Sequence, residues 1–165
     1  MKLRSLKRVF AYFCVNHLLA GTRFFTAKRS LLRWAGHEIG DGTKIVGPVF
    51  CTGSLKIGRD CWIGRSLTVH GNGSVEIGDR CDLAPGVVFL TGGHQIGSYE
   101  RRAGEGESYS VRVGDGCWIG AGATLMKDIT IGAGSVIAAC ACAGRDIPPD
   151  SLAGGVPAKV IRELT

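Results

Sequence analysis

One histidine of this chain has the surroundings of a general base. His94 lies near the start of a polar, glycine-rich stretch, GGHQIGSYERRAGEGESYS, which spans residues 92–110. A neutral imidazole can take the proton of an alcohol while the alcohol oxygen forms a new bond. Glu100, Glu105 and Glu107 follow in the same stretch, and a carboxylate there could orient the ring by binding its second nitrogen. The alternative is that His94 is a solvated loop residue.

The other candidates for chemistry have weaker support. His70 lies in the turn HGNG, whereas His17 and His37 are expected to be structural. The seven cysteines include no C-x-x-C pair, and their odd number argues against a complete disulfide framework. We interpret them as buried, reduced thiols that act as small apolar side chains.

A six-residue repeat must supply the scaffold for His94. Glycine, 26 of 165 residues, tends to follow an aliphatic residue at one phase of this repeat, as in Ile57-Gly58. This period fits neither a helix nor an alternating strand; it is typical of a parallel β solenoid with coils of about 18 residues. The expected inward positions are Ile39, Ile45, Cys51, Ile57, Ile63, Val69, Ile77, Leu83, Phe89, Val113, Ile119, Leu125, Ile131 and Ile137.

The repeat fails once, after Phe89, and resumes at Val113. Continuing the six-residue phase would put polar side chains into the core at Gln95, Arg101 and Glu107. We therefore expect residues 92–111 to form a loop that is extruded while the coil continues beneath it. Functional residues are frequent on loops that a rigid scaffold positions, and His94 lies at the root of this one.

The amino end of the chain is strongly basic. The formal net charge is +6 and the isoelectric point is near 9.1. The cations that precede the first acid are Lys2, Arg4, Lys7, Arg8, Arg23, Lys28, Arg29 and Arg33. This excess favours a phosphate-bearing partner or an anionic membrane surface. Nucleic acid is not expected, because the sequence has no recognised binding motif and no aromatic-basic sheet pattern.

Residues 1–34 precede the repeat and are expected to be helical. Apolar residues and one histidine recur at helical spacing, at Leu3, Leu6, Val9, Phe10, Phe13 and His17. The helix could pack on the end of the solenoid or on a neighbouring subunit, or it could contact anionic lipid. A signal peptide is a third interpretation, although Asn16 interrupts the apolar run and no A-x-A site follows. A membrane span is excluded, since no run of about 20 apolar residues occurs.

Three segments of the chain carry a resemblance to known proteins: IGDRCDLAPGVVFLTGGH (77–94), VGDGCWIGAGATLMKDITIGAGSVI (113–137) and DIPPDSLAGGVPAKVIREL (146–164). They resemble the hexapeptide-repeat acyltransferases, especially the galactoside, maltose and related sugar O-acetyltransferases. The resemblance implies an all-β fold, a left-handed parallel β-helix, with active sites between the subunits of a homotrimer. It also implies acetyl-CoA as the acyl donor.

The resemblance, which covers about residues 36–164, completes the expected organisation. We expect a basic helical segment (1–34), the β-helix with its extruded loop (35–147), and a carboxy-terminal segment packed on the β-helix (148–165). Both terminal segments are expected to contain a short helix. The chain is expected to be cytoplasmic, with an optional membrane contact through residues 1–34.

The resemblance also assigns roles to individual residues. His94 is expected to be the general base in a direct transfer without an acyl-enzyme, and Glu105 the acid that holds its tautomer. Trp118 is expected to line the groove near His94. For the donor, Ala121 and Ala139 match contacts to pantetheine or nucleotide, and Arg145, Lys159 and Arg162 match positions at the phosphate end of CoA. Cations there suit the 3′-phosphate and pyrophosphate, although each could be a solvated surface charge.

The acceptor is expected to be a sugar or a polysaccharide precursor. A short basic leader followed by G-x-x-I-G at residues 36–40 resembles enzymes that acetylate capsular or exopolysaccharide precursors. Asn72 and His70 are the candidate acceptor contacts. Alternatives are an N-acyltransferase on an amino nucleotide sugar, a serine O-acetyltransferase and a non-enzymatic hexapeptide-repeat scaffold. No metal is expected, because the H-x-x-x-x-H pair of the γ-type carbonic anhydrases, which bind zinc through three imidazoles, is missing.

Overall fold

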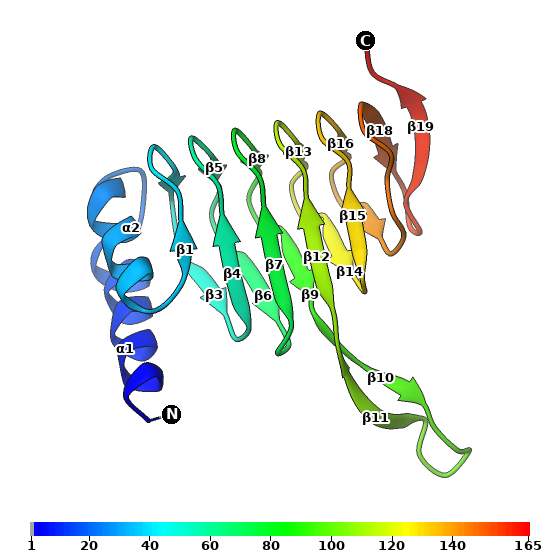
Figure 1. Ribbon diagram of the computed structural model, residues 1–165, viewed down its shortest axis with the longest axis horizontal. Coiled ribbons are helices and arrows are strands. Elements are labelled where there is room, and N and C mark those ends of the chain that lie inside the picture. The colour runs from blue at the N-terminus through cyan, green and yellow to red at the C-terminus, as the bar shows by residue number, and fades with distance from the viewer. Residues whose placement is uncertain (1) are drawn as a thin grey trace.

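Short parallel strands wind into a three-sided prism in the computed structural model, which describes residues 2–165 and the side chains from residue 6 onward (Figure 1). Sheet A contains β1 (Glu38–Ile39), β4 (Ser54–Ile57), β7 (Ser74–Ile77), β12 (Ser110–Val113) and β15 (Ile129–Ile131). Sheet B contains β2 (Lys44–Ile45), β5 (Trp62–Ile63), β8 (Asp82–Leu83), β13 (Trp118–Ile119), β16 (Val136–Ile137), β18 (Ser151–Gly154) and β19 (Lys159–Glu163). Sheet C contains β3 (Val49–Cys51), β6 (Leu67–His70), β9 (Val88–Leu90), β14 (Thr124–Met126) and β17 (Cys142–Ala143).

The inward column predicted from the six-residue repeat is the core of the prism. Every one of the predicted inward positions is buried. The strand register passes from Ile39 to Ile57 and on to Ile77, so the slip near Gly71 lengthens one coil without shifting the column. The predicted solenoid fold is therefore confirmed.

Glycine follows the inward residue because the next coil lies too close for a side chain. A Cβ on Gly58 would collide with the carbonyl oxygen of Gly78, one coil further along. Gly58 does not have a positive φ. The close approach of neighbouring coils, rather than an unusual turn conformation, thus explains this part of the repeat.

A ladder of buried donors runs along the corner between sheets A and B. At each coil a hydroxyl or thiol donates a hydrogen bond to a backbone carbonyl of the following coil. The pairs are Thr43 to Gly58 (2.7 Å), Cys61 to Gly78 (3.1 Å), Cys81 to Gly114 (3.1 Å), Cys117 to Gly132 (3.1 Å) and Ser135 to Pro148 (2.7 Å). Three cysteines therefore occupy positions that serine and threonine fill in other coils.

The segment expected to be extruded contains an antiparallel hairpin, β10 (Gly92–Ile96) and β11 (Ala103–Ser108). It leaves the corner between sheets C and A and projects away from the prism (Figure 1). Its base is closed by the backbone N–H of Tyr109, which donates to the carbonyl of Thr91 at 2.9 Å. The coil then continues in register, since Val113 pairs with Ile77.

The expectation of a carboxy-terminal helix is wrong. β18 adds one more parallel strand to sheet B, and β19 folds back antiparallel to it. Pro148, Pro149 and Pro157 oppose a helix because proline lacks the backbone donor that a helix needs. The β-branched pair Val160 and Ile161 favours the strand that forms instead.

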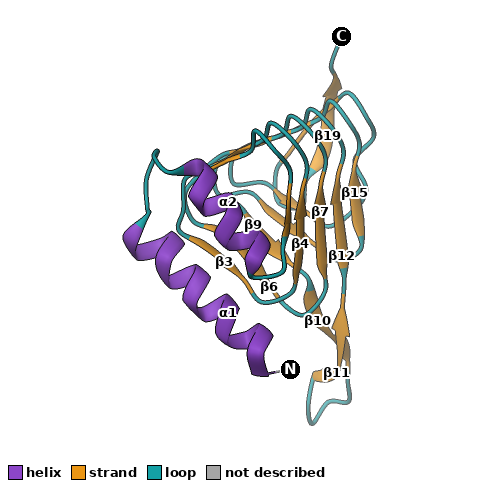
Figure 2. Cartoon of the chain, turned by 60° about the vertical axis from the view of Figure 1, so that its left-hand side comes forward, coloured by secondary structure: helices purple, strands orange, loops and turns teal. Residues whose placement is uncertain are grey.

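Two helices cover the amino-terminal end of the solenoid: α1 (Lys2–Phe13), continued by the short π-helical segment η1 (Cys14–Leu18), and α2 (Phe25–Trp34) (Figure 2). Basic residues of α2 cap the first coil. Lys28 is fully buried and its Nζ donates to the carbonyls of Gly21, Ile45 and Val46 at 2.5, 2.9 and 3.0 Å. Burial lowers the pKa of this ammonium.

Two further cations of α2 also bind the solenoid rather than a partner. Arg29 donates to the carbonyl of Thr43 at 3.0 Å. Arg33 donates to the carbonyl of Ile39 at 2.6 Å and forms an ion pair with Asp41 at 2.7 Å. Part of the basic excess at the amino end is therefore structural.

The helix α1 turns its small residues toward the solenoid. Ala11, Cys14 and Val15 are buried. The stripe of large apolar residues expected from the spacing faces outward instead, with Leu6, Val9, Phe10 and Phe13 all more than half exposed; the side chain of Leu3 lies outside the described residues. No helix among the described residues has the length and apolar character needed to cross a bilayer.

Candidate active site

His94 is held in one tautomer by the hairpin that carries it. It lies on β10 opposite Gly106 of β11. Its Nδ1 lies 2.9 Å from the carbonyl oxygen of Gly104. A carbonyl only accepts hydrogen bonds, so this contact requires the proton on Nδ1 and leaves the lone pair of Nε2 free. The neutral ring therefore presents a base.

Glu105 does not occupy the position expected for an orienting acid. It is exposed, and it follows Gly104, whose carbonyl is the partner of the imidazole. It also adjoins Gly106, which pairs with His94, so strand alternation turns its side chain to the opposite face of the hairpin. The tautomer-holding role expected for Glu105 is thus filled by a backbone carbonyl.

A pocket of about 440 Å³ brings the two predicted acceptor contacts next to His94. It lies at the corner between sheets C and A and is lined by His70, Gly71, Asn72, Gly92, Gly93, His94, Gly106, Glu107 and Ser108. The phenol of Tyr109 donates to Glu107 at 2.7 Å, and this bond raises the pKa of Tyr109. Two imidazoles, an amide and a carboxylate therefore border one polar cavity, a chemistry suited to hydroxyl-bearing ligands.

An aromatic residue beside this pocket was missed by the sequence analysis. Phe50 on β3 is 52% exposed, and its ring centroid lies 6.3 Å from that of His70. Phe50 also stacks on Tyr12, with the ring centroids 6.5 Å apart. The sequence contained one signal for this residue: Phe50 directly precedes the inward Cys51, so its aromatic side chain takes an outward position on the coil.

The residues expected to bind the donor lie elsewhere on the chain. Trp118 is 58% exposed on β13 of sheet B. Ala121 and Ala139 stack at the corner between sheets B and C, where the N–H of Cys140 donates to the carbonyl of Ala121 at 2.8 Å. Within one chain, Trp118 therefore lies on a different side of the prism from the corner that carries His94.

The three cations expected at the phosphate end of CoA are exposed but spread out. Lys159 and Arg162 lie on β19, opposite Gly154 and Leu152 of β18. Arg145 follows β17 at the corner between sheets C and A. Lys159 and Arg162 thus share one strand at the edge of sheet B, whereas Arg145 lies at the corner from which the hairpin projects.

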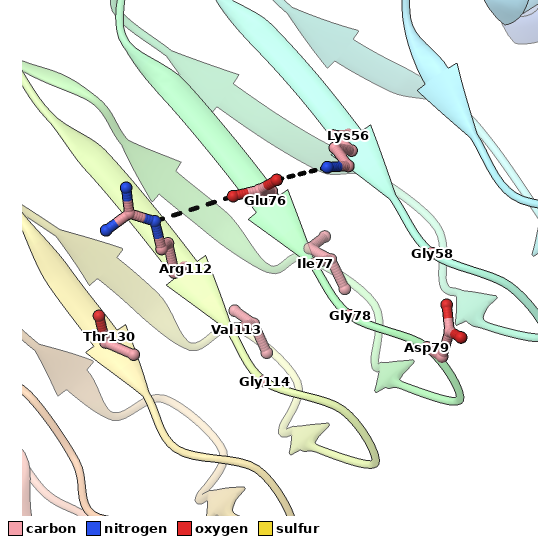
Figure 3. Close-up of a pocket in the computed structure, with 10 residues that line it drawn as sticks. All are labelled: Lys56, Gly58, Glu76, Ile77, Gly78, Asp79, Arg112, Val113, Gly114 and Thr130. Atoms are coloured by element: carbon pink, nitrogen blue, oxygen red, sulfur yellow. Dashed lines mark hydrogen bonds and ion pairs between the residues drawn. The ribbon is translucent and has the colours of Figure 1, made fainter.

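A second pocket, on sheet A, is lined by paired charges and not by predicted site residues (Figure 3). Glu76 lies between Lys56 at 2.6 Å and Arg112 at 3.7 Å, each on a neighbouring strand. The hydrogen bond from Lys56 lowers the pKa of Glu76. Because Glu76 pairs with a cation on each neighbouring strand, we interpret the row as cross-strand pairing between coils.

Cys61 and Cys81, two thiols of the donor ladder, are poorly suited to act as nucleophiles. Cys61, Cys81 and Cys117 are buried. The contact between the thiols of Cys81 and Cys117 is the main cause that raises the pKa of Cys81 to about 11, and the corresponding contact between Cys61 and Cys81 raises the pKa of Cys61. Since the thiolate is the reactive form, these two groups stay protonated and inert near neutral pH.

Comparisons with known proteins agree with this architecture. Residues 110–145 match the family model described as bacterial transferase hexapeptide (six repeats), and residues 54–90 match the hexapeptide repeat of succinyl-transferase. Galactoside O-acetyltransferase of Escherichia coli (strain K12) is 33% identical over 139 residues, which cover 83% of this chain and 68% of that protein.

Two solved structures are similar over 99% of this chain. A hexapeptide-repeat-containing acetyltransferase from Vibrio cholerae, complexed with acetyl coenzyme A, has a TM-score of 0.87 at 25% identity over 88% of its own chain. A galactoside acetyltransferase in complex with coenzyme A has a TM-score of 0.85 at 28% identity over 82% of its chain. With its buried six-residue column, its parallel coils and these relatives, the chain belongs to the hexapeptide-repeat acetyltransferase family.

Proposed function

We propose that this enzyme transfers the acetyl group of acetyl-CoA to a hydroxyl of a sugar or polysaccharide precursor, with His94 as the general base. The observation that carries the proposal is the hydrogen bond between Nδ1 of His94 and the Gly104 carbonyl. It fixes the tautomer that a base needs, on a ring that borders a polar pocket. The use of acetyl-CoA is supported by the similar structures that contain acetyl-CoA or CoA.

The proposed step needs only this one base. Nε2 of His94 takes the acceptor's hydroxyl proton as that oxygen attacks the thioester carbonyl, and the new C–O bond forms. The C–S bond then breaks, and the imidazolium returns the proton to the leaving thiolate. General-base assistance of this kind contributes about 10²–10⁴-fold, and alignment of the two substrates supplies much of the remaining rate. The buried ladder thiols favour direct transfer over an acyl-enzyme.

We further propose that the working enzyme is a homotrimer whose sites lie between subunits. One chain places His94 and the candidate donor residue Trp118 on different sides of the prism. The hairpin, which has His94 near its base, projects from the prism (Figure 1). A second copy docked against this corner could bring its Trp118, Ala121 and Ala139 to the imidazole. The separation within one chain is the physical reason to expect a shared site.

The proposed acceptor contacts are Asn72 and His70. Both border the pocket of His94, and an amide and an imidazole can each donate to or accept from sugar hydroxyls. Phe50 beside His70 offers an apolar surface for a sugar ring. For the donor, we propose that Lys159 and Arg162 bind the phosphates of CoA, with Arg145 as a further cation. A cytoplasmic location suits this donor.

One experiment tests the reaction and separates it from N-acylation. The purified enzyme is given acetyl-CoA with a panel of neutral sugars, glycan fragments and amino nucleotide sugars, and products are identified by mass spectrometry before and after alkaline hydroxylamine. We expect a product whose acetyl group is removed by hydroxylamine, as for an ester. A hydroxylamine-resistant product would assign N-acylation instead. No thiol release with any acceptor would contradict the proposed activity.

A further inference from the structure

The outward face of the amino-terminal cap is unusually apolar. Leu6, Val9, Phe10 and Phe13 of α1 are 65, 66, 56 and 53% exposed. They recur at intervals of three and four residues and so form one stripe along the helix. Exposed large apolar residues are normal singly, but a contiguous stripe marks a contact with another molecule or a membrane.

The stripe extends beyond α1 onto the second helix. The ring of Phe10 lies edge-on to that of Trp34 of α2 at 6.1 Å, and Trp34 is itself 49% exposed. Leu18 and Phe24, in the connection between the helices, are 64 and 60% exposed. The cap thus exposes large apolar side chains on both helices and on the segment that joins them.

This face is not needed to close the solenoid. The contacts with the first coil are made by buried Ala11, Cys14 and Val15 of α1 and η1, and by Leu32 and the cations of α2. The outward stripe is on the other side of α1. A helix that served only as an end cap would be expected to carry polar residues there.

The charges beside the stripe indicate the charge of its partner. The first acid in the sequence is Glu38, so the cap contains cations without carboxylates. Lys7 lies with its Nζ 5.2 Å from the ring centroid of Trp34, and Arg23 is exposed next to Phe24. Two copies meeting through this same face would bring like charges together, whereas an anionic surface would attract them.

We infer that α1, together with Trp34, binds the surface of an anionic lipid bilayer, lying in its plane with the apolar stripe inserted below the headgroups. An amphipathic helix with aromatic residues on one side and Lys or Arg beside them has the composition of such interfacial helices. This inference does not depend on the acceptor or on the base. It would concentrate the enzyme where membrane-bound acceptors are found.

Sedimentation of the full chain with vesicles tests the inference. We expect binding to phosphatidylglycerol vesicles, weaker binding to phosphatidylcholine vesicles, and a loss of binding as salt is raised. The double variant Val9→Gln/Phe13→Gln should lower affinity at least about tenfold by removing buried apolar area. Lys7→Gln/Arg23→Gln should lower it about fivefold per charge and flatten the salt dependence.

Ile96→Gln/Tyr99→Gln serves as a matched control. These residues are 89 and 81% exposed on the hairpin, so the variant removes similar apolar surface far from the cap and should bind vesicles as the parent does. Failure of the parent to sediment with phosphatidylglycerol vesicles at low salt would overturn the inference. So would a change of oligomeric state in Val9→Gln/Phe13→Gln, measured by analytical ultracentrifugation, because the stripe would then be a contact between subunits.

Discussion

The imidazole of His94 reaches across the hairpin to Gly104, with its Nδ1 2.9 Å from the carbonyl oxygen of that residue. The partner is a backbone atom, so no side-chain substitution at residue 104 removes it directly. The imidazole is therefore oriented by the pairing of β10 with β11, and its chemistry depends on the hairpin as a whole.

Replacing His94 should remove turnover and spare donor binding. We expect His94→Ala to lower kcat by about 10²–10⁴-fold, because only the transfer of the acceptor's proton is lost. Thiol release from acetyl-CoA measures the rate, and calorimetry measures CoA affinity. His17→Ala is the control, since His17 is exposed and lies in the amino-terminal cap. Equal rates for His94→Ala and the parent enzyme would rule out the base.

Glu105 provides a separate test of how the base is oriented. Since the Gly104 carbonyl already holds Nδ1, we expect Glu105→Gln to retain most of the parent kcat and the same pH profile. The measurement is kcat against pH for both enzymes. A loss as large as that of His94→Ala would show that the carboxylate, not the carbonyl, orients the ring during catalysis.

The cations on β19 should determine affinity for the phosphates of CoA. We expect Lys159→Gln/Arg162→Gln to raise the Kd of CoA by about tenfold per cation and to weaken its salt dependence. Dephospho-CoA, which lacks the 3′-phosphate, should discriminate less between parent and variant. Arg65→Gln, at an exposed position between β5 and β6, is the control. Unchanged Kd in the double variant would exclude this phosphate contact.

The ladder of buried hydrogen-bond donors between sheets A and B predicts unequal effects of two substitutions at Cys81. Cys81→Ala leaves the Gly114 carbonyl without its donor and should lower the free energy of unfolding by about 1–3 kcal/mol. Cys81→Ser keeps a donor, as Ser135 does two positions along the ladder, and should cost less. Urea denaturation followed by circular dichroism compares them. If the serine variant were the less stable of the two, apolar packing rather than hydrogen bonding would dominate at this position.

Lys28 should be a major contributor to the stability of the cap. Lys28→Met removes the donor shared by the carbonyls of Gly21, Ile45 and Val46, and should lower the free energy of unfolding by about 3 kcal/mol. Lys44→Met, at an exposed position of β2, is the matched control. Equal stability of the two variants in urea would mean that burying the ammonium costs as much as its three hydrogen bonds contribute.

Acid should weaken the contacts of Asp79. Its Oδ1 accepts the backbone N–H of Arg59 at 2.7 Å and its Oδ2 lies 2.9 Å from the Arg59 guanidinium, and these contacts lower its pKa. A carboxyl group whose pKa is lower in the folded than in the unfolded state stabilises the fold at pH values above its ordinary pKa. This stabilisation is lost as the pH falls through the folded-state pKa. The Tm difference between the parent and Asp79→Asn should therefore shrink from about pH 7 to about pH 3. A pH-independent difference would contradict this.

The coil could be predicted from the sequence because its period is local. Each inward residue, such as Ile57, must stack on its counterpart one coil away, so one glycine-marked phase identifies the whole column. The break after Phe89 could be predicted equally well, since polar residues cannot enter that column. Spacing alone could not say which side of α1 is buried. Small residues such as Ala11 allow a close approach to the first coil. The helix therefore buries these small residues and leaves the stripe of larger apolar residues exposed.

The site was less predictable because one partner in its key hydrogen bond is a backbone carbonyl and not a side chain. A sequence shows Glu105 as an acid near His94, but the carbonyl of Gly104 has no signature. Phe50 was missed for a related reason: its neighbours Tyr12 and His70 come from distant parts of the chain. The carboxy-terminal helix was expected from resemblance, whereas the prolines and β-branched residues of that segment already favoured strands.

Thr91 and Tyr109 meet at the foot of the hairpin through one backbone hydrogen bond, and the coil resumes in register beyond it. The packing of the coils therefore depends on the two ends of the inserted segment, and not on the length or composition of that segment. Such an attachment can be lengthened, shortened or exchanged between relatives with little penalty to the stack, because loop closure cost grows slowly with length. The hairpin side of the pocket, which includes Glu107 and Ser108, can therefore vary between relatives while His70, Asn72 and the prism beneath are kept intact.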